Sequence, residues 1–111
     1  MNDENAKELL VSIAVQAVID YREAYRKHEI NSIRLKRLKN TAQTQKVKNE
    51  IKGVKSMLSR SEIRMEEIES FFKSRWGVEC TGHSGDVTIK MIRERLAADN
   101  MEDREGIWRM I

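Results

Sequence analysis

Residues 35–51 read LKRLKNTAQTQKVKNEI, and the middle of this segment decides the fold. Apolar residues recur on both sides of it, whereas residues 40–44 lack large apolar side chains and supply Asn and Thr, which favour turns and helix caps. We therefore predict that two helices meet here and that the chain reverses direction at residues 40–44. The alternative is one continuous helix, since Ala42 and Gln45 extend the first apolar pattern, and such a rod would have to dimerise.

The spacing of apolar residues on either side of this segment predicts two long helices. The upstream pattern, at alternating steps of four and three, comprises Leu10, Ala14, Ala17, Tyr21, Ala24, His28, Asn31, Leu35 and Leu38. The downstream pattern comprises Val47, Ile51, Val54, Leu58, Ser61, Met65, Ile68 and Phe72. A repeat of 3.5 residues over about four heptads is typical of helices that pack along a continuous seam. We predict an all-α fold built on a long antiparallel helical hairpin, with helices at about 5–39 and 44–75 and with Leu35 facing Ile51.

A third, shorter helix is expected after the hairpin. Gly77 can end the second helix in the left-handed conformation, and two further glycines predict a loop over residues 77–85. The following helix, at about 86–98, carries one apolar face and would pack at the open end of the hairpin. That face comprises Ile89, Ile92 and Leu96. With 111 residues, the chain is expected to form a single helical domain over residues 1–111.

The C-terminal tail, residues 99–111, is charged at first and apolar at its end. Apolar side chains at a chain end have to be covered by other parts of the chain or by a partner. We therefore predict oligomer contacts at these residues, with a homodimer as the simplest assembly. They are Ile107, Trp108, Met110 and Ile111.

Positive charge is concentrated in the predicted hairpin. Between Arg22 and Arg60 the chain carries twelve Lys and Arg residues against three acids, a net charge of +9, although the whole chain carries only +3. A cluster of this kind attracts phosphates or an acidic protein surface, although lysine also serves simply to solvate the outer face of a helix. The predicted partner-binding residues, called the basic tip below, are Arg34, Lys36, Arg37, Lys39, Lys46, Lys48, Lys52 and Lys55.

Residue types that support catalysis or metal binding are sparse. Cys80 and His83 have the spacing Cys-x-x-His, but the only other histidine is His28, which is too few ligands for a zinc site. His28 and Asn31 interrupt the apolar pattern, and we expect them to fix the register of the helices and to bond to each other or to water. We predict a protein that is not an enzyme and has no metal and no cofactor.

The sequence predicts no membrane association. No apolar run approaches the roughly 18 residues of a membrane span, and Met1 is followed by Asn2, Asp3 and Glu4 instead of a basic and then apolar signal peptide. The single cysteine agrees with a reducing compartment. We expect a cytoplasmic protein.

Two segments of the chain resemble small, mostly uncharacterised prophage-encoded helical proteins of Gram-positive bacteria. The first is Ala17-Val18-Ile19-Asp20-Tyr21-Arg22, and the second is Ile68-Glu69-Ser70-Phe71-Phe72-Lys73-Ser74-Arg75-Trp76 followed by Thr81-Gly82. The similarity as a whole covers about half of the chain. The resemblance departs after Thr81, where those proteins have Asp-Gly and this chain has Ser84-Gly85-Asp86. It implies a phage origin and expression in a bacterial host cell, but no mechanism.

Two functions are compatible with these expectations. The favoured one is a phage protein that binds, and thereby inhibits, a host protein with an acidic surface or a nucleoprotein such as a CRISPR nuclease. The alternative is a DNA-binding or transcription-associated phage protein that contacts the phosphate backbone of nucleic acid. No aromatic residue lies between Tyr25 and Phe71, so base stacking by this segment is not expected. A purely structural oligomer, joined by the apolar tail, is the third possibility.

Overall fold

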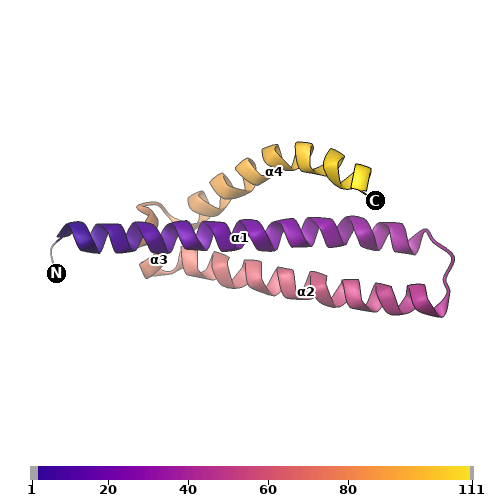
Figure 1. The fold of residues 1–111 in the computed structure, drawn as a ribbon. Coiled ribbons are helices and arrows are strands. Elements are labelled where there is room, and N and C mark those ends of the chain that lie inside the picture. Colours follow the sequence, from indigo (N-terminus) through magenta and orange to yellow (C-terminus); the bar gives the residue numbers. More distant parts are fainter. Residues whose placement is uncertain (1–2, 111) are drawn as a thin grey trace. The chain divides into compact units, whose positions relative to one another are not determined.

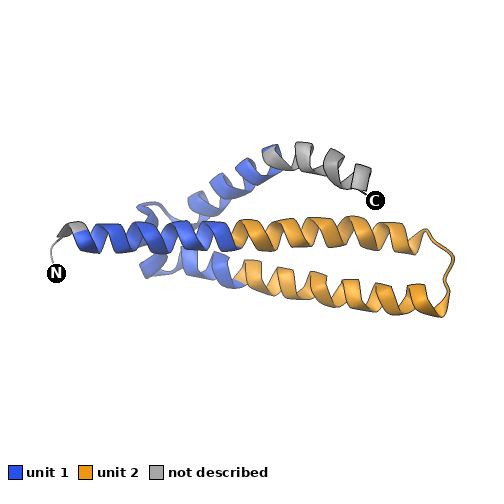
Figure 2. Cartoon of the chain, in the orientation of Figure 1, with its two compact units in different colours: residues 1–20, 67–111 blue, residues 21–66 orange. Residues whose placement is uncertain are grey.

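The computed structural model describes the backbone of residues 3–110 and the side chains of residues 5–98. It contains four helices, α1 (Asp3–Lys39), α2 (Gln45–Lys73), α3 (Arg75–Thr81) and α4 (Gly85–Met110), and no strand within the described residues (Figure 1). The chain divides into two compact units, one formed by residues 21–66 and the other by residues 1–20 and 67–111 (Figure 2). The prediction of an all-α protein with a helical hairpin is confirmed.

Residues 21–66, drawn in orange in Figure 2, form the hairpin unit with its turn. The distal part of α1 and the first part of α2 run antiparallel and are joined by residues 40–44 (Figure 1). Polar side chains build this reversal: Thr44 Oγ1 accepts a hydrogen bond from the Val47 N–H at 3.2 Å and so caps α2. Gln43 Nε2 donates to the carbonyl of Leu38 at 3.1 Å, which satisfies one of the free acceptors at the end of α1. The predicted turn is confirmed, and the alternative of a continuous helix is wrong.

The core of the hairpin unit consists of residues from the predicted seam. Tyr21 and Val54 are each 1% exposed, and Ala24 and Ser61 are also buried. The Ser61 hydroxyl donates to the carbonyl of Met57 at 3.0 Å, so this buried polar group is satisfied within its own helix. Because large and small side chains alternate along the seam, the two helices can pack closely.

The other unit, residues 1–20 and 67–111, has its own core. Phe72 is completely buried, and its ring centroid lies 5.6 Å from that of Phe71. In α4, Ile89 and Leu96 are buried and Ile92 is partly buried, so the predicted apolar face is confirmed. Charged groups join α4 to the end of α2 through ion pairs. These are Arg93 with Glu69, and Lys73 with Asp86 at 3.8 Å.

The predicted loop at residues 77–85 is wrong, because most of this segment forms α3. Ser74 is the N-cap of α3, and its hydroxyl accepts a hydrogen bond from the Gly77 N–H at 3.1 Å. Gly77 is a buried helical residue and not a stop; a Cβ there would lie 2.0 Å from the carbonyl oxygen of Phe71. The left-handed stop is Gly82, with a φ of 71°.

The predicted limits of the last helix and of the tail also differ from the structure. The helix starts at Gly85, where a Cβ would lie 2.5 Å from the Cα of Lys73, so glycine allows the close approach of α4 to α2. The helix continues to Met110 instead of ending near residue 98. The predicted oligomer contacts, at Ile107, Trp108, Met110 and Ile111, lie outside the residues whose side chains are described.

None of the described helices combines the length and the apolar character that a membrane span requires.

Candidate anion-binding surface at the hairpin tip

The structure places the whole basic tip in the hairpin unit. Four of its residues end α1 and four lie in the first eleven residues of α2, on either side of the turn at residues 40–44. All eight side chains are exposed. Over residues 34–55 they face a single acid, Glu50, which gives this segment a formal charge of +7. The predicted cluster of cations is therefore brought together at one end of the unit.

Most of these cations have no partner within the described chain. Arg37 has an interaction of its own, but the other seven side chains make no hydrogen bond or ion pair among the described residues. Outside the tip, several cations pair with acids, as Lys27 does with Glu23 at 3.0 Å and Arg75 with Glu79 at 3.6 Å. Among the described residues, seven cations of the tip thus lack a protein partner and are available to an anionic one.

The start of α2 carries positive charge where the helix dipole disfavours it. The N-terminal end of a helix has a partial positive charge, so acids stabilise the first turn and bases destabilise it by about 0.3–1 kcal/mol each. The first turn of α2 has no acid and contains Lys46, and Lys48 follows two residues after Lys46. In the last turn of α1, Lys36 and Lys39 do match the dipole. The helix dipole thus favours Lys36 and Lys39 of α1 but opposes Lys46 of α2.

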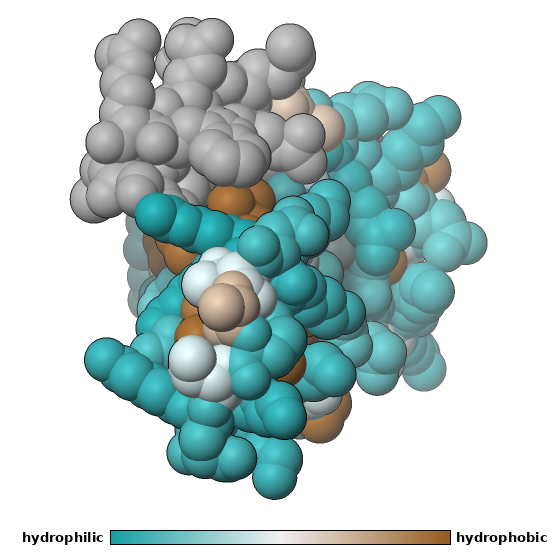
Figure 3. All heavy atoms as spheres, turned by 90° about the vertical axis from the view of Figure 1, so that its right-hand side faces the viewer, coloured by the Kyte–Doolittle hydropathy of each residue, from teal (hydrophilic) through white to brown (hydrophobic). Residues whose placement is uncertain are grey.

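The surface of the tip is mainly hydrophilic. The space-filling view onto the turn shows mainly hydrophilic residues over this end of the unit (Figure 3). Within the hairpin unit, residues 21–66, the large exposed apolar side chains are Ile30, Met57 and Ile63, so none lies within residues 31–56. A surface of this composition lacks the apolar and aromatic centre that is usual in stable protein interfaces.

The two polar residues of the seam have partners other than those expected. His28 Nε2 lies 3.1 Å from Oε1 of Glu62 on α2, and Asn31 Nδ2 donates to the carbonyl of Lys27 at 2.9 Å. These contacts replace the expected bond between His28 and Asn31: His28 reaches across to α2, and Asn31 bonds back to its own helix. Both residues are satisfied within the hairpin.

Cys80 lies within α3 and His83 lies just after the end of this helix. Cys80 is buried in α3, and its burial, followed by the charge of Glu79, raises the pKa of its thiol above the ordinary value. A raised pKa lowers the fraction of thiolate, which is the nucleophilic and metal-binding form. Within the part of the chain that the structure describes, no group of three or more His, Cys, Asp or Glu side chains could hold a metal ion.

Sequence reasoning did not identify an exposed apolar stripe near the start of α1. Val11, Val15 and Val18 are 59%, 50% and 36% exposed and lie at helical positions i, i+4 and i+7. Their spacing was a signal that could have shown them as one face. The stripe lies in the unit formed by residues 1–20 and 67–111 and contributes nothing to the basic tip.

Comparisons with known proteins give no match to a family model, to a curated protein or to a solved structure. The resemblance to small prophage proteins therefore stays a prediction.

Proposed function

We propose that this chain is a cytoplasmic binding protein of a bacterial host cell, without catalytic activity, that docks its basic tip on an anionic surface and blocks it. The partner is a host protein with an acidic surface or a nucleoprotein complex, and the specific role we propose is that of a phage inhibitor acting on a host defence factor such as a CRISPR nuclease. The observation that carries this proposal is the group of seven exposed cations without a partner in the described chain.

The single sign of charge in the tip favours a role in binding over simple solvation of the helices. Solvation needs charge of either sign, and mixed charges with i, i+4 pairs would also stabilise the helices. The tip instead carries one sign of charge, including cations at the start of α2 where the helix dipole opposes them. The segment accepts this cost, which supports a role in binding.

The experiment is affinity capture from a bacterial lysate with two variants of equal charge change. In the tip variant, Arg34, Lys46 and Lys48 are replaced by Glu. In the control variant, three exposed cations outside the tip, Lys7, Arg60 and Lys90, are replaced by Glu. We expect the tip variant to lose the partners that the unchanged protein and the control variant capture. Capture of the same partners by all three proteins would exclude the tip as the contact.

The second candidate function is direct binding to the phosphate backbone of nucleic acid. It is favoured by the absence of large exposed apolar side chains from residues 31–56, because phosphate contacts need no apolar centre. Treating the lysate with nuclease before capture separates the two functions. Partners held through nucleic acid are lost after this treatment, whereas partners bound through an acidic protein surface are retained.

A further inference from the structure

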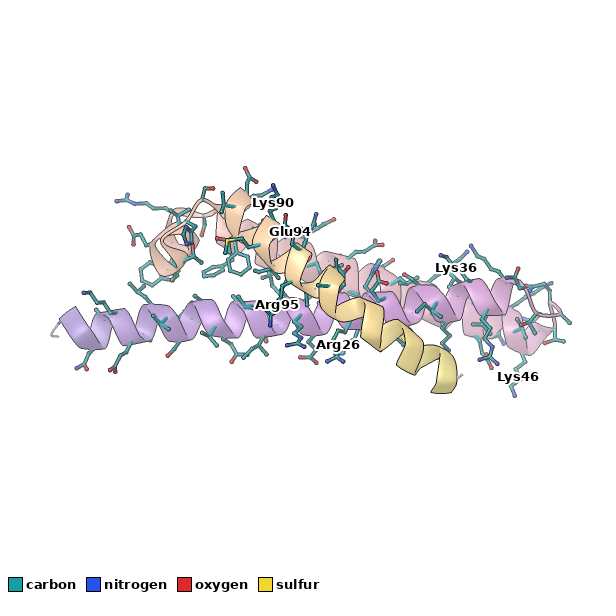
Figure 4. All side chains as sticks on the ribbon, turned by 90° about the horizontal axis from the view of Figure 1, so that it is seen from above. Arg26, Lys36, Lys46, Lys90, Glu94 and Arg95 are labelled. Atoms are coloured by element: carbon teal, nitrogen blue, oxygen red, sulfur yellow. The ribbon has the colours of Figure 1, made fainter. Side chains whose placement is uncertain are left out.

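The basic tip has two sides, and they differ in charge. On α2, Lys48, Lys52 and Lys55 lie at positions i, i+4 and i+7, so their side chains leave the helix on one face. Lys46 is not part of this row. In Figure 4, Lys46 and Lys36 point to opposite sides of the hairpin.

The contact between His28 and Glu62 shows how this row lies relative to α1. Glu62 continues the row at position i+7 from Lys55, and its carboxylate reaches His28 on α1 at 3.1 Å. The row therefore runs along the seam on one flank, next to α1. Toward the turn, the charged residues of α2 on the same flank are all lysines.

Two of the three matching positions of α1 are also lysines, and the third is Ser32. In an antiparallel pair, residues that follow equivalent seam positions lie on the same flank. Lys48 follows Val47 of the seam and Lys39 follows Leu38, so Lys39 and Lys48 occupy opposing positions on this flank. Lys36 lies one turn before Lys39. This lysine flank, which contains no acid, comprises Lys36, Lys39, Lys48, Lys52 and Lys55.

The other flank has a different composition. Glu50, the only acid of residues 34–55, precedes Ile51 of the seam, and Arg34 precedes Leu35, so a base and an acid hold opposing positions there. Opposite charges at such positions stabilise paired helices, whereas like charges destabilise them. Helix pairing therefore accounts for Arg34 and Glu50 but not for the lysine flank, which needs an anion from outside the hairpin.

The geometry points to the phosphate backbone of duplex nucleic acid as that anion, and this inference rests on the proposed function of the basic tip. Lys48 and Lys55 are about 10 Å apart along α2 at 1.5 Å per residue, and the two helix axes of a packed pair are about 8–10 Å apart. Along one strand of a duplex, phosphates follow one another at about 3.4 Å of axis, so the row on α2 spans about three phosphate steps and the shorter row on α1 about one.

The residue types favour phosphate over an acidic protein. Lysine is a point charge on a flexible stem that fits phosphates in many geometries, and it is depleted in protein interfaces. The flank offers no large exposed apolar side chain and no aromatic ring. It therefore lacks the apolar centre that is usual in protein interfaces and has no ring that could stack on unpaired bases. Binding should therefore be independent of base sequence.

The test is fluorescence anisotropy of the full chain with a labelled random-sequence DNA duplex of about 20 base pairs, long enough to span both lysine rows, at increasing NaCl. The logarithm of the association constant should fall against the logarithm of salt with a slope of about −0.9 per phosphate contacted, hence about −4.5 for five lysines. Affinity should then drop about 500-fold between roughly 50 and 200 mM salt.

Two triple variants of equal charge change locate the contact. Replacing Lys48, Lys52 and Lys55 by Gln should reduce the slope by about 2.7, whereas replacing three exposed cations outside the tip by Gln should leave it nearly unchanged. These control positions are Lys7, Arg60 and Lys90. Far-UV circular dichroism confirms that both variants are folded. Equal losses in both variants would overturn the lysine flank as the contact.

The identity of the partner is tested in the same assay. No binding of the unchanged protein to the duplex at about 50 mM salt, or tighter binding to poly-glutamate or to a single strand than to the duplex, would overturn the inference. These results leave the proposed function standing if the lysate experiment still shows capture that depends on the tip. Loss of that capture as well would remove both.

Discussion

The Nε2 atom of His28 lies 3.1 Å from Oε1 of Glu62, and this contact joins α1 to α2 across the hairpin. This contact identifies which face of α2 lies beside α1 on one flank of the seam. Because Glu62 lies in one row with Lys48 and Lys55, the contact also places these lysines next to α1. The side on which the cations gather thus follows from one polar pair.

The first prediction concerns the strength of this pair. The side chains of His28 and Glu62 are 26% and 58% exposed, so solvent screens their interaction. A double-mutant cycle with His28→Ala and Glu62→Ala, measured by urea unfolding at pH 7, should give a coupling of about 0.2–1 kcal/mol. A coupling of zero within error would show that the contact contributes nothing to holding the register.

The second prediction concerns two glycines in different surroundings. Gly77→Ala should destabilise the protein by about 1–3 kcal/mol or more, because its Cβ would lie 2.0 Å from the carbonyl oxygen of Phe71. Gly53 is the matched control, since it is also helical but nothing lies within 4 Å of a Cβ there. Gly53→Ala should stabilise the protein by up to about 1 kcal/mol. Thermal and urea unfolding measure both changes, and equal effects would contradict the close approach at Gly77.

These glycines also show why part of the fold could not be predicted. The turn at residues 40–44 was predictable, because its Thr and Gln side chains make local hydrogen bonds and the apolar pattern stops there. Gly77 was misread because glycine serves equally for a left-handed stop and for a close backbone approach. Only the position of Phe71 relative to Gly77, a tertiary property, distinguishes the two uses.

The candidate site was predictable to a similar depth. The cluster of cations follows from the sequence once the chain reverses, and all eight predicted residues are exposed near the turn. The division of the tip into a lysine flank and a mixed flank depends on the rotation of each helix about its axis. Heptad spacing fixes which residues face the partner helix, but the contact at Glu62 was needed to relate one flank of α2 to α1.

The third prediction concerns the thiol of Cys80. Its burial, followed by the charge of Glu79, raises its pKa, so less thiolate is present at a given pH than in an unfolded chain. Alkylation by iodoacetamide at about pH 8, followed by mass spectrometry, should be slower in the folded protein than in urea. Equally fast labelling in both states would contradict the raised pKa.

The same shift has a consequence for stability. The folded state holds the thiol proton to a higher pH than the unfolded state, so this group favours folding below the ordinary thiol pKa. That contribution is lost as the pH rises from the ordinary thiol pKa through the raised one. Urea unfolding above pH 8 should therefore show a smaller loss of stability for Cys80→Ser than for the unchanged protein.

The last prediction tests whether the tip sacrifices stability for binding. Lys46 lies in the first turn of α2 and opposes the helix dipole, so Lys46→Glu should raise the free energy of unfolding by about 0.3–1 kcal/mol or more at low salt. Lys39 lies in the last turn of α1, where the dipole favours a cation, and Lys39→Glu should lower stability by a similar amount. Both changes remove the same charge from the tip, so relief of repulsion among the cations is common to both variants. The difference in stability between the variants therefore isolates the effect of the dipole.

Thermal unfolding at about 20 mM and about 500 mM salt measures this difference, which should shrink at the higher salt because the effect is screened. If the two variants change stability equally, the cations at the start of α2 carry no dipole cost, and the argument that they are kept for binding loses its support.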